Sequence, residues 1–225
     1  MTTSGTQTWE LDISEIIIEA SGMAGGPPES GYDAESARRS LNMLFADLTN
    51  RGVPLWKLVQ YTQALVDGTS SYTLPAAVVD VLQAVTRRSN VDVACKRISF
   101  QEYLNISTKA TEGRPNQFCT ARGKDTATLY LWPTPENSTD TFVYWGIKRM
   151  DDAGASKFTA DVPYRFIPAI VHGLAFFMAK KNKNFPLDRL TMLKNEYEEL
   201  LATAREEDRD RAGYVVKLGN GSGRR

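Results

Sequence analysis

Few residues in this chain of 225 could do chemistry. The single histidine, His172, lies within an apolar stretch and has no cysteine or carboxylate at the spacing that a metal site needs. We expect His172 to be packed with a ring nitrogen bonded to a backbone carbonyl; a catalytic histidine is the alternative. The sequence contains no GxSxG, P-loop, GxGxxG or HExxH motif.

The cysteines and the acidic clusters also lack the partners that catalysis requires. Cys95 and Cys119 are isolated, with no CxxC spacing, so we expect reduced core residues rather than a disulfide. Asp151-Asp152 and Glu206–Asp210 have no supporting base or further ligand, which favours solvated surface over a pair of catalytic carboxylates. The sequence therefore predicts no catalytic residue, no metal ligand, no cofactor and no enzymatic activity.

Two aromatic segments, Leu129–Trp132 and Phe142–Trp145, have two interpretations. Aromatic side chains on a sheet can stack nucleic-acid bases, usually with basic residues interleaved. Because no basic residues are interleaved here, we expect these side chains to form the core of a sheet.

The charge balance restricts the partners. Lys plus Arg number 27 and Asp plus Glu number 27, which gives a net charge of zero. Domains that bind nucleic acid tightly are usually clearly basic, so the balance argues against that role but not against a protein that DNA slides past. Residues Met1–Thr8 lack the pattern of a secretory signal. The longest apolar run is shorter than the roughly 18–20 residues needed to cross a bilayer, so no membrane partner is expected.

That apolar run, within Asp161–Lys183, predicts a buried helix. Phe166, Ile170 and Leu174 recur at helical spacing, and neighbouring apolar residues leave little surface for water. We expect Asp161 to be the N-cap and Pro168 to bend the helix or delay its regular part. A second amphipathic helix from Pro186 toward Arg211 should pack against it as an antiparallel hairpin.

Two further helices are expected near the N-terminus. In Leu11–Ser21 the apolar residues share one helical face, and Asp12 or Ser14 could cap the helix. Because the segment is rich in β-branched residues, a strand is the alternative. The second helix should run from a cap at Asp33 to Arg51 and end at Gly52.

Between these helices the hydrophobic period changes to that of strands, which we expect to pair antiparallel. The capping-box pattern of Ser99 and Glu102 predicts one helical turn over Phe100–Leu104. The expected strands are Trp56–Ala64, Ser71–Leu74, a strand within Ala77–Arg88, Lys96–Ser99, Phe118–Arg122, Thr126–Trp132 and Thr141–Arg149.

The predicted fold class is α+β. A helical bundle forms from the N- and C-terminal segments, 1–53 and 151–211, and a small antiparallel β-sandwich or barrel, 54–150, is inserted between them. An extended C-terminal tail, 212–225, follows.

The order of several short segments resembles the head-to-tail adaptor proteins of tailed bacteriophages, also called head-completion, connector or tail tubular proteins. The resemblance covers about Leu11–Asp210. The segments that carry it are Gly31–Asn42, Asn50–Trp56, Tyr72–Pro75, Ile98–Tyr103, Gly113–Pro115, Leu129–Pro133, Asp161–Phe166 and Tyr197–Glu199.

This resemblance implies a structural virion protein at the neck, made in the host cytoplasm. Such a protein forms a homo-oligomeric ring, expected to be twelve-fold, beneath the portal protein and docks a tail or nozzle protein on its other side. Genomic DNA would pass through the lumen without sequence-specific binding. A tail-tube or nozzle component with the same fold, and a stand-alone nucleic-acid-binding module, are the alternatives.

The tail supplies the candidate partner-binding residues. Residues 213–225 are too polar and glycine-rich to pack alone, but the strand-like piece within them could add to an exposed sheet edge of a neighbouring subunit or of the portal. A terminus without any binding role is the alternative. The residues are Tyr214, Val215, Val216, Lys217 and Leu218.

Overall fold

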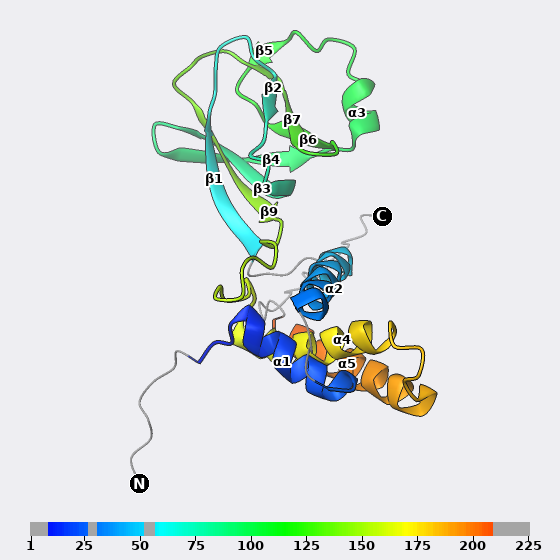
Figure 1. Ribbon diagram of the computed structural model, residues 1–225. Helices are drawn as coiled ribbons and strands as arrows, with labels where there is room; N and C mark the ends of the chain where they lie inside the picture. The colour runs from blue at the N-terminus through cyan, green and yellow to red at the C-terminus, as the bar shows by residue number, and fades with distance from the viewer. Residues whose placement is uncertain (1–8, 27–30, 52–56, 209–225) are drawn as a thin grey trace, which may run out of the picture.

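The computed structural model describes residues 9–26, 31–51 and 57–208 of the chain. It is a mixed α+β fold with five α-helices among these residues and a large curled sheet made mostly of antiparallel strands. Figure 1 shows the four long helices gathered on one side and the sheet standing on the other. Each side has its own cluster of buried apolar residues.

Helix α1 (Ile13–Ala24) begins at the predicted cap. Asp12 Oδ1 accepts from the Glu15 backbone N–H at 2.8 Å, and Glu15 Oε2 accepts from the Asp12 N–H at 3.0 Å. This capping box satisfies two backbone donors that the helix itself leaves unpaired. The helix is thus confirmed, and the alternative strand is wrong. At its end Gly25 adopts φ of 122°, which favours glycine.

Helix α2 (Gly31–Asn50) confirms the second N-terminal helix, but the predicted cap is wrong. The helix already begins at Gly31, and Asp33 lies inside its first turn, where a negative charge interacts favourably with the helix dipole. The expected end at Gly52 lies outside the described residues.

The buried C-terminal helix starts later than predicted. A 3₁₀ turn, η2 (Tyr164–Phe166), leads into α4 (Ile167–Ala179), so Asp161 is not the N-cap. Pro168 lies in the first turn of α4, where its missing N–H costs no hydrogen bond, and it therefore delays the regular helix rather than bending it. The predicted burial is confirmed, with Ile170 and Leu174 completely inaccessible to solvent.

Helix α5 (Leu187–Glu207) packs against α4 and runs antiparallel to it, as predicted. Arg165, just before α4, pairs with Asp208, just after α5, so the open ends of the hairpin meet. The expected continuation to Arg211 lies beyond the described residues. Helix α4 also contacts α1 and α2, which makes it the centre of the helical core. None of the helices that the structure describes is long and apolar enough to span a bilayer.

The main sheet has seven strands in the order β1-β9-β3-β4-β6-β7-β2. Two short strands, β5 (Glu112–Gly113) and β8 (Thr134–Pro135), pair separately. The strands of the main sheet are β1 (Leu58–Ala64), β2 (Ser71–Thr73), β3 (Val78–Arg88), β4 (Val91–Arg97), β6 (Gln117–Arg122), β7 (Ala127–Trp132) and β9 (Thr141–Lys148).

The prediction of a purely antiparallel sheet is wrong in two places, since β4 pairs with β6 and β5 pairs with β8 in parallel. Parallel neighbours need a long crossover. The crossover from β4 to β6 contains α3 (Phe100–Leu104), whose predicted capping box between Ser99 and Glu102 is confirmed. It brings the chain back beside the end of β4, where Lys96 and Arg97 pair in parallel with Gln117 and Phe118 at the start of β6.

Strand β4 begins earlier than the predicted Lys96–Ser99. Ser89 and Asn90 both have positive φ, 48° and 61°, and close a tight hairpin between β3 and β4. Most side chains of β4 are exposed, so the strand shows no alternation of apolar and polar residues that the sequence could reveal.

The core of the sheet confirms the structural interpretation of the aromatic segments. Leu129, Leu131, Phe142 and Tyr144 are buried in one cluster. The other aromatic residues of these segments lie outside this cluster: Tyr130 and Trp132 are half-buried against Ile98 and Tyr103, and Trp145 is 45% exposed.

The close packing around α4 leaves no room for a side chain at Gly173. A Cβ at this position would lie 2.8 Å from the Tyr197 ring and 3.0 Å from Leu44 Cδ1. We expect Gly173→Ala to reduce the free energy of unfolding by about 1–3 kcal/mol, because both neighbours are fixed in the core. Urea denaturation measures this.

The control is Gly22→Ala in α1, where a Cβ would meet no atom within 4 Å. That substitution should stabilise the helix by about 0.5–1 kcal/mol. Equal effects of the two substitutions would contradict the close packing at Gly173.

Candidate functional site

His172 has the packing role that the sequence predicted. Its Nδ1 lies 2.9 Å from the Pro168 carbonyl oxygen one turn earlier, and its Nε2 lies 3.8 Å from Glu196 on α5. Both contacts are made within the α4–α5 hairpin. The ring is therefore held on α4 by the hydrogen bond to Pro168 and lies beside Glu196 of α5.

The two cysteines are free and buried, as predicted. Burial raises the pKa of the Cys119 thiol to about 11 and also raises the pKa of Cys95. Both groups are therefore uncharged thiols at neutral pH, whereas a nucleophilic cysteine requires the thiolate.

The acidic clusters form ion pairs; Asp151 and Asp152 are solvated as predicted, whereas the Asp208 side chain is only 10% exposed. Asp151 lies 3.1 Å from Lys148, and Asp152 lies 3.0 Å from Arg149. In the cluster Glu206–Asp210, Asp208 pairs with Arg165, while residues 209 and 210 lie outside the described part. Within residues 9–26, 31–51 and 57–208, no group of three or more potential ligands could hold a metal ion.

The predicted partner-binding residues, Tyr214 to Leu218, all lie outside the described residues. The structure therefore brings none of them to a surface that can be named. The structure does show the ion pairs and hydrogen bonds that hold the strands of the sheet together and connect the sheet to the helices.

Two buried carboxylates hold the sheet through arginines. Asp80, whose side chain is only 3% exposed, accepts from Arg97 at 3.0 Å and also from Arg122. Burial alone would raise the pKa of Asp80, but the hydrogen bonds from Arg122, Arg97 and the Val81 amide outweigh burial and lower it. The carboxylate links β3 to the ends of β4 and β6.

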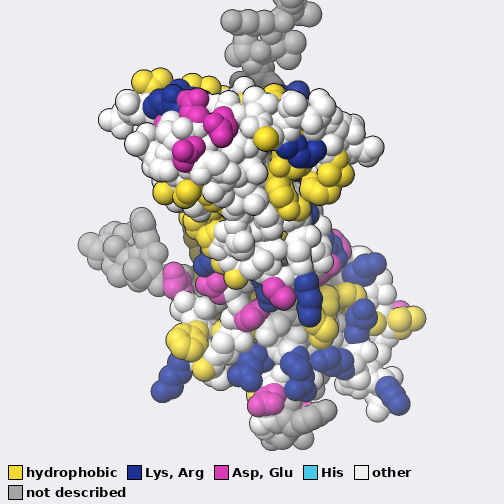
Figure 2. Space-filling model, turned by 90° about the horizontal axis from the view of Figure 1, so that it is seen from above, with side chains coloured by type: hydrophobic (Ala, Val, Ile, Leu, Met, Phe, Trp, Pro, Cys, Tyr) yellow, Lys and Arg dark blue, Asp and Glu magenta, His cyan; other side chains and the backbone are white. Residues whose placement is uncertain are grey.

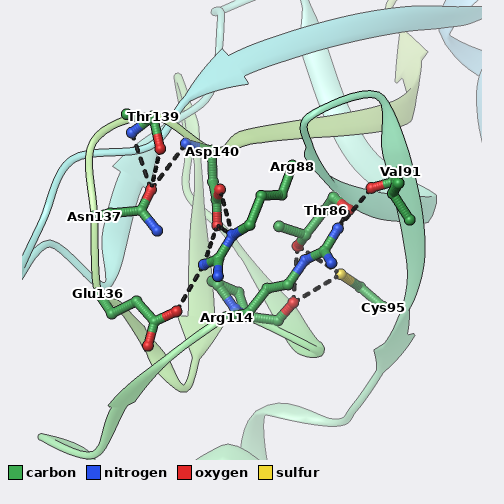
Figure 3. Close-up of polar contacts among 10 residues, drawn as sticks. Thr86, Arg88, Val91, Cys95, Arg114, Glu136, Asn137, Thr139 and Asp140 are labelled. Carbon is green, nitrogen blue, oxygen red and sulfur yellow. Dashed lines mark hydrogen bonds and ion pairs between the residues drawn. The ribbon is translucent and has the colours of Figure 1, made fainter.

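Asp140 forms the second such contact, which Figure 3 shows. Arg88 at the end of β3 donates to Asp140 through Nε at 2.8 Å and Nη2 at 2.7 Å, and Nη2 also reaches Glu136 at 2.7 Å. Asn137 Oδ1 accepts from the Thr139 and Asp140 amides, both at 3.0 Å. These bonds fix the loop between β8 and β9 against β3.

Arg114 fixes the crossover loop in the same region (Figure 3). Its Nη2 donates to the carbonyl oxygens of Thr86 at 2.6 Å and Val91 at 2.7 Å. The Thr86 hydroxyl donates to the Pro115 carbonyl at 2.8 Å. Sequence reasoning missed the arginine contacts of Asp80, Asp140 and the Arg114 loop, because the partners are 17 or more residues apart and carry no local pattern.

Lys57 connects the two sides of the molecule. It lies directly before β1, its side chain is 4% exposed, and it donates to Asp161 in the segment before η2. The same Asp161 oxygen accepts from the Asp151 N–H at 2.9 Å. Burial lowers the pKa of Lys57, and Lys148 lowers it further. This contact joins the two places where the chain passes between the helices and the sheet.

Two surface hollows are candidates for contact with partners. One, of about 480 Å³, lies on the outer face of the sheet around Trp145, Gln60, Gln83 and Val85. The other, of about 670 Å³, is formed by Glu10, by Ile13 and Phe45 of the first two helices, and by residues within 151–163. Both hollows are open to solvent. His172 and Cys119 line neither of them, and Cys95, which lines the first, is an uncharged thiol.

The Arg88–Asp140 contact predicts a dependence of stability on pH. Hydrogen bonds from Arg88 lower the pKa of Asp140 below its ordinary value. A depressed folded-state pKa contributes stability that is present above the unfolded-state pKa and is lost as pH falls toward the folded-state value. Asp140→Asn should therefore unfold more easily at pH 7, by about 1–3 kcal/mol, and lose less stability between pH 6 and pH 3 than the wild type.

Urea titrations at several pH values test this. The matched control is Asp125→Asn, in the exposed turn between β6 and β7, which should change neither the stability at pH 7 nor its pH dependence. An unaltered slope in Asp140→Asn would show that the contact contributes nothing to acid sensitivity.

Residues 5–219 match the family described as SU10 adaptor protein. A search of curated proteins found no significant match. Since the match extends over nearly the whole chain, this chain belongs to the SU10 adaptor protein family, a family of bacteriophage structural adaptors.

Proposed function

We propose that this protein is the head-to-tail adaptor of a tailed phage, which forms a ring beneath the portal, extends the DNA channel and docks the tail. The observation that carries the proposal is the family match over residues 5–219. The ring is expected to be twelve-fold.

In this proposal the helices of segments 1–53 and 151–211 act as one bundle, and residues 54–150 act as an inserted barrel-like module. The two parts give a subunit two chemically different surfaces, as a ring of head-to-tail contacts requires. The Lys57–Asp161 contact would keep those surfaces in a fixed relation to each other.

The balanced charge suits a channel for DNA. Every phosphate neutralised by Lys or Arg adds affinity, which would slow passage of the genome. We expect the protein to show no salt-dependent retention on immobilised double-stranded DNA at 150 mM salt, with a basic DNA-binding domain as the positive control. Specific retention that weakens with added salt would favour a nucleic-acid-binding module instead.

The tail residues Tyr214, Val215, Val216, Lys217 and Leu218 are proposed to bind the portal or a neighbouring subunit by adding a strand to an exposed sheet edge. Deleting residues 213–225 should abolish co-sedimentation with portal rings and leave the thermal unfolding transition unchanged. The control is a shorter deletion of residues 222–225, which keeps the strand-like piece and should bind normally.

Two outcomes would contradict this assignment. If the longer deletion still sediments with portal rings, the tail is not the portal-binding segment. If the full-length protein joins purified tails but not portal rings, the protein is a tail-tube or nozzle component.

A further inference from the structure

Strand β1 is an unprotected edge of the main sheet. The other edge strand, β2, has three residues, whereas β1 has seven and pairs only with β9 among the described strands. Proteins usually protect a long edge with charged side chains, proline or a bulge, because its unpaired backbone groups bind other strands. Charged side chains cover much of the molecule, as Figure 2 shows, but β1 contains none, and it has neither proline nor a bulge. Such an edge is typical of a site that another strand covers.

The pairing of β1 with β9 identifies the backbone groups that face outward. Leu65, directly after β1, donates its N–H to the Asp140 carbonyl at 3.1 Å, so these two residues form a hydrogen-bonded pair. In an antiparallel ladder every second residue bonds to the partner strand, and the residues between direct their N–H and C=O to the other side. Gln60 and Thr62 therefore point both backbone groups away from β9.

The last residue of β1 agrees with this alternation. The Ala64 carbonyl accepts from the Gln63 side-chain amide at 2.9 Å instead of from β9. Gln60 and Thr62 have no such cover: no described strand lies beside them on the open side, and both residues are exposed. Their backbone groups are therefore available to a further strand.

The two faces of β1 differ in polarity. Tyr61 is half-buried against the core of the sheet and stacks on Tyr144, with the ring centroids 5.5 Å apart. Val59 lies on the same face as Tyr61, and Gln60 and Thr62 lie on the opposite face, since side chains alternate along a strand. A strand that adds to this edge should therefore be apolar on one face and tolerate polar residues on the other.

The strand-like piece of the C-terminal tail, which lies outside the described residues, has this pattern. In an extended chain Tyr214, Val216 and Leu218 would share one face, and Val215 and Lys217 would share the other. The first face is apolar throughout and matches the apolar face of β1. The second would place the charge of Lys217 on the polar side.

The tail begins near β1. Asp208, directly after α5, pairs with Arg165, and Asp161 in the segment before η2 pairs with Lys57, directly before β1. Figure 1 shows one end of β1 next to the helices. Residues 209–213 can span up to roughly 17 Å when extended, enough to carry the strand-like piece away from its own subunit. A subunit's own tail would start beside the beginning of β1 and run parallel to it, which is the less stable pairing, whereas a neighbour's tail can pair antiparallel.

We infer that residues 214–218 of one subunit add to the β1 edge of a second copy of the same chain, antiparallel to β1. The donated strand and the accepting edge are different surfaces of every subunit, so the contact is head to tail and repeats around a ring. This inference rests on the proposed ring function and names the edge that accepts the tail.

Thr62→Pro tests the accepting edge. It removes an outward N–H and places a proline ring at the edge, but it removes no hydrogen bond to β9. Assembly, followed by native mass spectrometry alone and with portal rings, should weaken at least about tenfold. The matched control is Thr62→Ala, which keeps the N–H and should assemble like the wild type. The thermal unfolding transition of Thr62→Pro, measured in parallel, should stay close to that of the wild type.

A mixture of two variants tests donor and acceptor together. The Thr62→Pro chain keeps its tail but lacks the accepting edge, and the chain without residues 213–225 keeps the edge but lacks the tail. Neither variant alone should form rings. Their equimolar mixture should form a one-to-one heterodimer and nothing larger, because it contains only one matching pair of surfaces. The heterodimer would also show that both variants are folded.

The outcomes separate the inference from the function on which it rests. If Thr62→Pro forms rings as well as the wild type, or the mixture contains no heterodimer, the β1 edge does not accept a neighbour's tail and the adaptor function stands. A heterodimer between variants that each still form normal rings would place the tail on its own subunit and equally contradict the inference. If the wild type forms no oligomer with or without portal rings, the proposed ring function itself is contradicted.

Discussion

The apolar surface of α4 must be covered on several sides, and this requirement organises the helical half of the protein. Ile170, Leu174 and Ala175 are completely buried, and α1, α2 and α5 all contact this helix. Burying a large aliphatic side chain contributes about 1.5–3 kcal/mol, so the buried residues of α4 contribute strongly to the stability of this half. The same burial holds α5 against α4.

Buried charge has a different part in the structure. Asp80, Asp140 and Lys57 are each buried and each have an oppositely charged partner. Ion pairs of this kind add little net stability compared with apolar residues, but removing one partner is costly because the other charge remains buried. They therefore fix the geometry: two of them hold loops and strand ends to β3, and the third holds the beginning of β1 beside the segment that leads into α4.

The sequence predicted the elements whose signal is local. Asp12 and Ser99 cap their helices through capping boxes, His172 packs on a carbonyl, and β7 alternates between buried and half-buried residues. It could not predict the parallel β4–β6 pair, because β4 is exposed on most of its length. Nor could it predict that Asp161 forms an ion pair with Lys57 instead of capping α4, since Asp161 and Lys57 are 104 residues apart.

The order of the elements has a consequence for biosynthesis. Helices α1 and α2 leave the ribosome first, but α4, which covers them, follows more than a hundred residues later. Strand β1 likewise cannot pair until β9, its neighbour in the sheet, has been synthesised. Contacts this distant along the chain form slowly, and exposed apolar helices and strand edges promote aggregation in the meantime. The nascent chain should therefore depend on host chaperones until β9 and α4 have been synthesised.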